Sequence, residues 1–345
     1  MRNPTLHERR NQQILAAVVR RYVETGEPVS SGAISRHDAK DLSPATIRNV
    51  MADLEEGGYL FQPHTSAGRI PTAAGYRFFA REVAAQAMLR PADRDWIRRE
   101  LASAKTPEEI TERAGHVLAA ISQGLGIIVS PPLAKTVVEH LRFLRLPDAR
   151  VVVVLISSGG VARDKVVRPE RMFTQEELDR TAEIINRDYV GWTFEAVRAD
   201  LLARLASERE RYNQLVSNAL LLCAPDLLGD APGRQIHVEG TAQIAASGFS
   251  DRTQLRELLA AIEEKHCLVA LLTSCIEAPE PVHVQIGVKE IGAGDSLALI
   301  SAPYTLHDQV QGSLGVLGPM RMQYERAITA VAYVARLFSE TLSRS

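Results

Sequence analysis

The stretch SPATIRNVMADLEEGGYLFQPHTSAGRIPT, which runs from Ser43 to Thr72, decides the fold of the first part of the chain. Ser43 is a typical helix N-cap and Pro44 suits the first helical position, so a helix is predicted to begin here. Its apolar residues recur at helical spacing and predict one buried face, namely Ile47, Val50, Met51 and Leu54. The pair Gly57-Gly58 is expected to end the helix.

The second half of the stretch is typical of a β-hairpin. The short apolar runs YLFQP (59–63) and IPT (70–72) flank the polar tip HTSAGR (64–69). Gly68 permits a tight turn or a positive φ angle in this tip. A helix with a polar outer face and, directly after it, a hairpin are therefore predicted.

Two further helices are predicted ahead of Ser43. Residues 6–26, LHERRNQQILAAVVRRYVETG, carry one apolar face and end in glycine. Residues 27–36, EPVSSGAISR, predict a short second helix capped by Ser30 or Ser31. Three helices followed by a two-stranded hairpin is the order of a winged helix-turn-helix module, whose third helix enters the major groove of DNA.

The outer face of the third helix suits base recognition. Arg48 can pair with guanine and Asn49 with adenine, each worth about 1–3 kcal/mol of discrimination. The small side chains of Ala45 and Ala52 allow close approach to the groove. The backbone N–H groups at 43–46 offer a phosphate site at the start of the helix.

The hairpin tip supplies hydrogen-bond donors for the DNA backbone or the neighbouring minor groove, where an arginine experiences the strongest negative potential. A polar helix face alone is usually only a solvated surface, and Glu55 and Glu56 oppose contact with phosphates. The order of the elements favours DNA binding. The candidate DNA-binding residues are Ser43, Thr46, Arg48, Asn49, His64, Thr65, Ser66, Gly68 and Arg69.

The rest of the chain predicts an α/β domain interrupted by a helical block. Strands are expected at Val151–Ile156, covered on both faces, at the partner segment 161–168, and at 267–275, 282–288 and 296–304. The predicted divisions are 1–90 for the DNA-binding domain, 91–105 for a linker, 106–168 and 251–345 for the two parts of the α/β domain, and 169–250 for the insertion.

Charge and composition set further bounds. The 345 residues carry a formal net charge of -2, but residues 1–81 carry a net +3, which suits a nucleic-acid module joined to an acidic remainder. The three cysteines form no disulfide framework and fit a reducing cytosol. No signal peptide and no uncharged apolar run of roughly 20 residues is present, so a cytoplasmic protein without membrane contact is expected.

An enzyme is the alternative of a different class. The residues His266, Cys267, Cys275 and His283 could be metal ligands, but their spacing matches no compact zinc pattern, and buried inert thiols are favoured. The chain has no P-loop, and GLG at 124–126 lacks the third glycine of a dinucleotide site. No catalytic residue, cofactor or metal is therefore predicted.

One long block gives a specific resemblance. The segment LSPATIRNVMADLEEGGYLFQPHTSAGRIPTAAGYRFF (42–79) closely resembles the N-terminal signature of the heat-inducible transcription repressor family HrcA. Shorter segments follow in the order expected for that family: GIIVSPP (126–132), ARVVVVLISSGGV (149–161), VQIGVKE (284–290) and LGPMRMQYERAITAVAYVARL (317–337). The resemblance covers essentially the full length.

The resemblance implies an α+β multidomain repressor: a winged helix-turn-helix, then a central GAF-like α/β domain interrupted by a mainly helical inserted dimerisation domain. It also implies a homodimer that binds an inverted-repeat operator ahead of chaperone genes. The repressor is expected to be released on heat stress, and the GroE chaperonin to maintain its active form.

The alternative within the same class is a winged-helix repressor that senses a small ligand through the GAF-like domain. The segment SSGG at 157–160 could cradle an anion, although such a segment is more often a plain hairpin turn.

Overall fold

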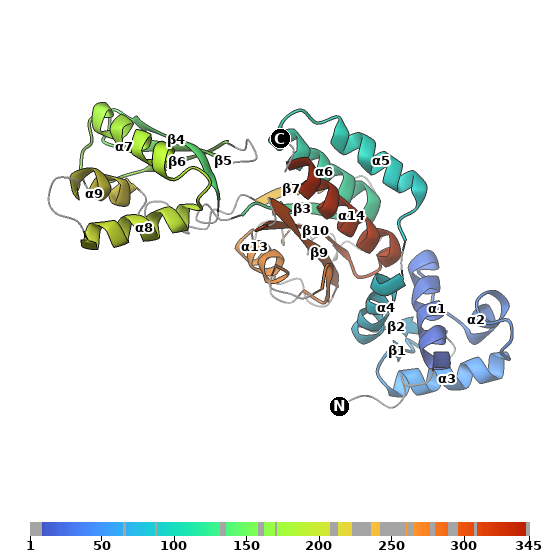
Figure 1. Ribbon diagram of the computed structural model, residues 1–345. Helices are drawn as coiled ribbons and strands as arrows, with labels where there is room; N and C mark the ends of the chain where they lie inside the picture. The colour runs from blue at the N-terminus through green and yellow to red at the C-terminus, as the bar shows by residue number, and fades with distance from the viewer. Residues whose placement is uncertain are drawn as a thin grey trace.

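A computed structural model describes most of the chain, and the statements below concern only the residues it describes (Figure 1). These are residues 9–64, 67–86, 88–131, 136–157, 162–169, 171–207, 213–222, 236–241, 260, 265–276, 280–288, 296–306 and 309–342. Figure 1 shows three parts: an N-terminal head, a central body and a lobe on the other side of the body.

The head, residues 9–72, has the element order predicted from the sequence. Its elements are α1 (Arg9–Thr25), α2 (Ser31–His37), α3 (Pro44–Glu56), β1 (Leu60–Phe61) and β2 (Ile70–Pro71). The two strands pair antiparallel, with Phe61 opposite Ile70. The three helices and the hairpin expected here are thus confirmed.

Local sequence signals set the ends of these helices. The side chains of Ser30 and Ser43 accept hydrogen bonds from the backbone N–H of the third residue of α2 and of α3, as N-caps do. Gly26 and Gly58 adopt φ angles of 73° and 76° just beyond α1 and α3, a region that favours glycine. The N-caps predicted for α2 and α3 are therefore confirmed, and so are the glycines predicted to end α1 and α3.

The body is built on one antiparallel sheet in the order β7-β3-β10-β9-β8. Its strands are β3 (Leu125–Val129), β7 (Ile236–Glu239), β8 (His283–Ile286), β9 (Leu297–Leu306) and β10 (Gln309–Pro319). Its helices are α5 (Pro91–Ala102), α6 (Pro107–Ser122), α13 (Lys265–Ser274) and α14 (Tyr324–Leu342). Helices α6 and α14 cover one face and α13 the other, so β3 is buried along its whole length.

Two predictions for the body need correction, and one strand was not predicted. The expected linker 91–105 contains α5, whose Ile97 and Leu101 are buried against the body, so the connection is a packed helix. The strand predicted at 267–275 is wrong, because this apolar segment forms α13. Strand β10, which sequence analysis did not select, is the central strand of the sheet.

The lobe, residues 136–222, has a sheet and a core of its own. Its strands are β4 (Val138–Arg145), β5 (Val151–Ser157) and β6 (Ala162–Val167), in the order β4-β5-β6. Its helices are α7 (Gln175–Asp188), α8 (Phe194–Ser207) and α9 (Asn213–Leu222). Residues 106–168 were expected to form the first part of the interrupted α/β domain, but β4, β5 and β6 pack with these helices into a separate hydrophobic core.

Among the residues that the structure describes, the sheet of the lobe is covered on one face only. Along β5, Val151, Val153 and Leu155 are buried, whereas the alternating residues between them are only half-buried. Along β4, Leu141 and Phe143 are buried and Arg142 and Leu144 are exposed; Leu144 and Val166 of β6 are each 46% exposed. The expectation of a strand covered on both faces is therefore wrong, because no described residue covers the face of the sheet that carries Leu144 and Val166.

The lobe lies in sequence between two paired strands of the body. Strands β3 and β7 are antiparallel neighbours, with Val129 opposite Ile236 at the end where the chain leaves β3 and later enters β7. Residues 130–235, which include the lobe, are therefore inserted at one end of this strand pair.

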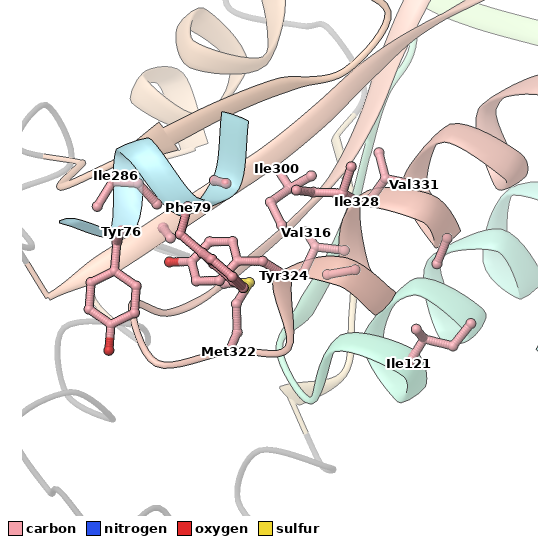
Figure 2. Packing of buried hydrophobic residues seen from close by; sticks show 14 of the residues in the cluster. Tyr76, Phe79, Ile121, Ile286, Ile300, Val316, Met322, Tyr324, Ile328 and Val331 are labelled. Carbon is pink, nitrogen blue, oxygen red and sulfur yellow. The ribbon is translucent and has the colours of Figure 1, made fainter. Parts of the chain in front are cut away.

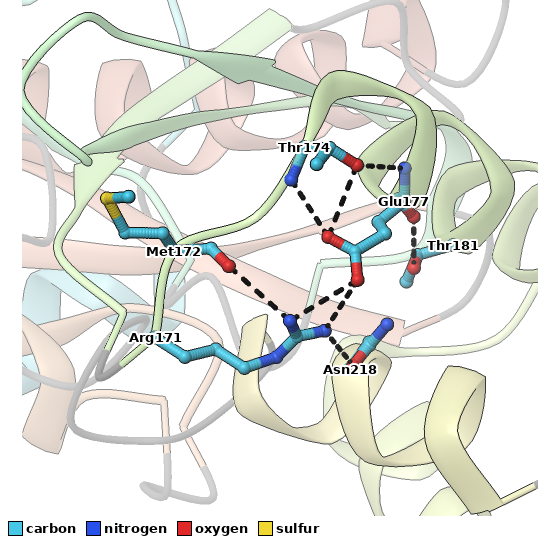
Figure 3. A network of polar contacts seen from close by, with 6 residues as sticks. All are labelled: Arg171, Met172, Thr174, Glu177, Thr181 and Asn218. Atoms are coloured by element: carbon cyan, nitrogen blue, oxygen red, sulfur yellow. Dashed lines mark hydrogen bonds and ion pairs between the residues drawn. The ribbon is translucent and has the colours of Figure 1, made fainter.

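A polar network joins the helices of the lobe (Figure 3). The guanidinium of Arg171 donates to Oδ1 of the buried Asn218 at 2.5 Å and to Glu177 at 3.3 Å. Glu177 forms a capping box with Thr174 at the start of α7. Arg171 therefore connects α9 to the first turn of α7.

Head and body share one continuous hydrophobic core. Figure 2 shows the part of this core in which α4 meets the body. Helix α4 (Ala73–Gln86) leads from the head and packs on both α1 and α14. Tyr76 and Phe79 of α4 contact Tyr324 at the start of α14, with ring centroids 5.8 and 6.3 Å apart. Burial raises the pKa of Tyr76 and of Tyr324, so both hydroxyls stay protonated.

Within the residues that the structure describes, no helix is long and apolar enough to cross a membrane.

Candidate nucleic-acid interface

Helix α3 has a buried face and an exposed face. The four residues predicted to point inward, Ile47, Val50, Met51 and Leu54, are at most 7% exposed. The opposite face is exposed to solvent and consists of Ala45, Arg48, Asn49, Ala52, Asp53 and Glu56. The helical pattern read from the sequence is therefore confirmed, and the two alanines leave room for close approach to this face.

The start of α3 is held by its own cap. The backbone N–H of Thr46 donates to Oγ of Ser43 at 3.1 Å, and the two hydroxyls lie 2.9 Å apart. The N–H of Ile47 donates to the carbonyl of Ser43, and Pro44 has no N–H. The amides of Thr46 and Ile47 are therefore engaged, which narrows the phosphate site expected at 43–46 to the amides of Ser43 and Ala45.

Arg48 and Asn49 both reach solvent from the first half of the exposed face. They lie one turn beyond Ser43, near the positive end of the helix dipole, which favours an anion such as a phosphate. Two other exposed cations, Arg36 at the end of α2 and Lys40 in the turn before α3, were not selected from the sequence. Their position in the RHDAKD segment beside the N-cap is the signal that could have selected them.

The hairpin begins directly after α3. His64 is exposed at its tip, and its carbonyl accepts the N–H of Ala67 at 2.8 Å. The side chain of Gln62 donates to the carbonyl of Ala67 at 2.9 Å and closes the tip. Thr65 and Ser66, two of the predicted contact residues, lie outside the described residues.

Arg69 is engaged inside the head. Its Nε donates to Oε2 of Glu55 at 2.9 Å, and its side chain is only 15% exposed. Its backbone N–H and carbonyl both pair with Val29 at 2.9 Å. Arg69, which was expected to reach the minor groove, thus forms an internal ion pair, because Glu55 in the last turn of α3 faces the hairpin.

Gly68 is required for a different reason than expected. Its φ angle is outside the positive range found for Gly26 and Gly58. A Cβ atom at this position would lie 2.5 Å from the backbone of Val29. Close approach between the hairpin and the α1–α2 connection, rather than a turn geometry, therefore calls for glycine here.

The cysteines give no support for a metal centre. Among the described residues, no group of three or more His, Cys, Asp or Glu side chains could hold a metal ion. Cys275 is buried and Cys267 is half-buried. Burial raises the pKa of the Cys275 thiol, so it stays protonated. Cys223 and most of the SSGG segment at 157–160 lie outside the described residues.

Comparison with known proteins identifies the class and the family. The family profile described as HrcA protein C terminal domain matches residues 108–328. A heat-inducible transcription repressor HrcA of Geobacter sulfurreducens is 36% identical over 96% of this chain and 97% of its own. That of Xylella fastidiosa strain M12 is 36% identical over 99% of this chain and 97% of its own.

A crystal structure of a hypothetical protein at 2.2 Å resolution has the same fold, with a TM-score of 0.61, 22% identity, and coverage of 98% of this chain and 99% of its own. Together these matches define the class: the chain is a transcription repressor, and the relatives are named as repressors rather than as enzymes. It belongs to the HrcA family of heat-inducible transcription repressors.

Proposed function

We propose that the chain represses heat-shock genes by binding an inverted-repeat operator through its head. The head is a winged helix-turn-helix in this proposal, with α3 in the major groove and the hairpin as the wing. The single observation that carries it is the exposed pair Arg48 and Asn49, on a helix face with two alanines. A major groove about 12 Å wide admits a helix with such a face.

In this proposal the body is the GAF-like domain and the lobe is the inserted dimerisation domain. The lobe starts near residue 136 rather than at 169, because β4, β5 and β6 belong to its core. The head and α4 then end near residue 86, and α5 belongs to the body.

The open sheet face of the lobe supports the proposed homodimer. Leu144, Val152 and Val166 form an apolar row across the three strands. The next row places Arg142 on β4 and Asp164 on β6, on either side of the central strand. When two such sheets pack face to face around a two-fold axis parallel to the strands, Arg142 lies over Asp164 of the second copy. The face is thus complementary to itself in charge as well as in apolarity.

The dimer is tested by placing a charge on this face. Leu144→Glu should yield monomers in sedimentation equilibrium, because an unpaired carboxylate would be buried in the interface. Leu202 on α8 is also 46% exposed, so Leu202→Glu is a matched control that should stay dimeric. Dissociation of the Leu202 variant instead would place the interface on the helical side of the lobe.

The GroE chaperonin and heat enter as further parts of the proposal. A few degrees change the population of the folded repressor appreciably if its stability is marginal, because about 1 kcal/mol shifts the midpoint by only a few degrees in a protein of this size. Exposed apolar side chains on the lobe, including Met172 at 68% and Val190 at 53%, give a chaperonin a surface to bind.

The deciding experiment is selection of binding sites from random duplexes by the full-length chain, with and without chaperonin and at two temperatures. Enrichment of a palindrome is the expected result, with greater recovery in the presence of chaperonin and less at the higher temperature. Recovery of no consensus would contradict operator binding. The ligand-sensing alternative is not favoured by the family to which the chain belongs.

A further inference from the structure

The carboxylate of Glu55 contacts both strands of the hairpin. Its Oε1 accepts the backbone N–H of Gln62, which follows β1, at 3.1 Å. Its Oε2 accepts Nε of Arg69, which precedes β2, at 2.9 Å. Because Phe61 and Ile70 form the last strand pair, Gln62 and Arg69 are the next positions toward the tip. One side chain of α3 therefore holds the hairpin at the base of its tip.

The hairpin is also held from its other side. The backbone of Arg69 exchanges two hydrogen bonds of 2.9 Å with Val29, in the connection between α1 and α2. Gly68 lies against the same connection without room for a Cβ atom. The base of the tip is thus fixed between α3 and this connection, while the exposed His64 extends beyond it.

Glu55 is in an electrostatically unfavourable place. It lies in the last turn of α3, where the helix dipole is negative and disfavours a carboxylate. In a DNA-binding head it would also lie near phosphates, which repel it. A carboxylate in this place is explained by its two contacts with the hairpin, and the neighbouring Glu56, which is exposed, has no such contact described.

We infer that Glu55 is the positioning residue of the DNA-binding surface: it fixes the hairpin relative to α3, with Arg69 as its internal counter-ion. The inference rests on the proposed DNA binding and adds to it, since it removes Arg69 from the DNA contacts. The hairpin then reaches DNA through its tip, with His64 as the described side chain in place to do so.

The test compares Glu55→Gln with Glu56→Gln, using the duplex enriched by the wild-type chain. Both substitutions remove one negative charge from the same turn, and electrostatics alone predicts equal or tighter binding for both. Positioning predicts that Glu55→Gln weakens binding by roughly tenfold, the size of one charge-assisted hydrogen bond. Binding by the Glu55 variant that equals that of the Glu56 variant would overturn the inference.

A second measurement separates positioning from direct contact. Arg69→Gln should weaken binding and leave the slope of log affinity against log salt unchanged, because Arg69 does not neutralise a phosphate. A slope reduced by about one unit would show a phosphate contact and contradict the inference.

Amide hydrogen exchange tests the contact between Glu55 and the hairpin in the absence of DNA. In Glu55→Ala the amide of Gln62 should exchange at least about tenfold faster, while the amides of Met51 and Leu54 in α3 keep their protection and show that the head is folded. Unchanged exchange at Gln62 would overturn the inference. If the wild-type chain enriched no duplex, the proposed function would fail, and this measurement would still decide whether Glu55 positions the hairpin.

Discussion

Arg20 of α1 donates two hydrogen bonds to Oε1 of Glu325 in the first turn of α14, at 2.8 and 3.2 Å. The same guanidinium lies over the ring of Phe79, 5.8 Å from its centroid. Together with the contact between Phe79 and Tyr324, this pair fixes the side of the head that faces the body. The ion pair therefore adds a polar contact between α1 and α14 to the apolar packing that joins the head to the body.

Separate and combined replacement of Arg20 and Glu325 by Gln should reveal a coupling of about 0.5 kcal/mol, because both side chains are about half exposed and solvent screens the pair. The measurement is amide protection in α1, compared across the double-mutant cycle. Arg21→Gln, one position along, is the control and should leave that protection unchanged. Zero coupling would mean that the ion pair does not help to hold the head on the body.

Asp93 joins α5 to α14. The hydrogen bond from Arg326, at 2.8 Å, holds the pKa of the Asp93 carboxyl below its ordinary value, against the effect of burial and with help from Arg90. The stabilisation that the ionised Asp93 carboxylate gives the folded protein is therefore complete above the pKa of an aspartate in the unfolded chain, about 3.9. It is lost as the pH falls through the lower pKa of Asp93 in the folded protein.

We accordingly expect Asp93→Asn to lower stability by about 1–3 kcal/mol at pH 7 and by progressively less as the pH falls below 4. Fluorescence of Trp96, in the same helix, reports the unfolding. Asp95→Asn is the matched control, because its side chain is 63% exposed and pairs only distantly with Arg94. If Asp93→Asn lowered the free energy of unfolding by the same amount at pH 7 and at pH 3, the role of the ionised carboxylate would be contradicted.

Arg171→Met should loosen α9 within the lobe. The substitution keeps an apolar stem but removes the donors to Asn218 and Glu177, which costs about 1–2 kcal/mol and speeds amide exchange in α9 roughly tenfold. Arg180→Met removes an exposed pair with Glu176 and serves as the control, with an effect of a few tenths of a kcal/mol. Equal effects of the two variants would show that the network adds nothing beyond a surface pair.

Arg48→Ala and Asn49→Ala should each reduce discrimination between the selected operator and a scrambled duplex by about 1–3 kcal/mol, while non-specific binding changes little for Asn49. Gel shifts at fixed salt measure the ratio. Arg94→Ala removes one exposed cation from α5 in the body and controls for charge alone. Unchanged discrimination in both head variants would exclude α3 as the reading element.

The head was predictable from the sequence because its signals are local. The N-cap Ser43, the proline after it and the apolar spacing of α3 all lie within one helix and agree with one another. The role of Arg69 was not predictable, since its partner Glu55 lies 14 residues away and the two meet only when the hairpin folds back. A counter-ion of this kind is a tertiary contact and leaves no periodic pattern.

Two errors in the body have different causes. The continuously apolar segment of α13 predicts a strand, although its buried residues are spaced as on one helical face: Leu268, Leu271, Leu272 and Cys275. Strand β10 was missed because its three glycines lower its β propensity. At Gly315 a Cβ atom would lie 2.4 Å from the carbonyl oxygen of Ile300 on β9, so glycine is required by the neighbouring strand.

The pairing of Val129 with Ile236 gives the chain a modular architecture. Strands β3 and β7 form an antiparallel pair that a two-residue turn could close, so residues 130–235 are, topologically, one very long hairpin loop. Such a site accepts or releases a whole folding unit without rethreading the sheet. A shortened chain with a tight turn there would retain the residues of the head and the body and would lack the surface that we propose for the homodimer, so each molecule would carry a single DNA-binding head.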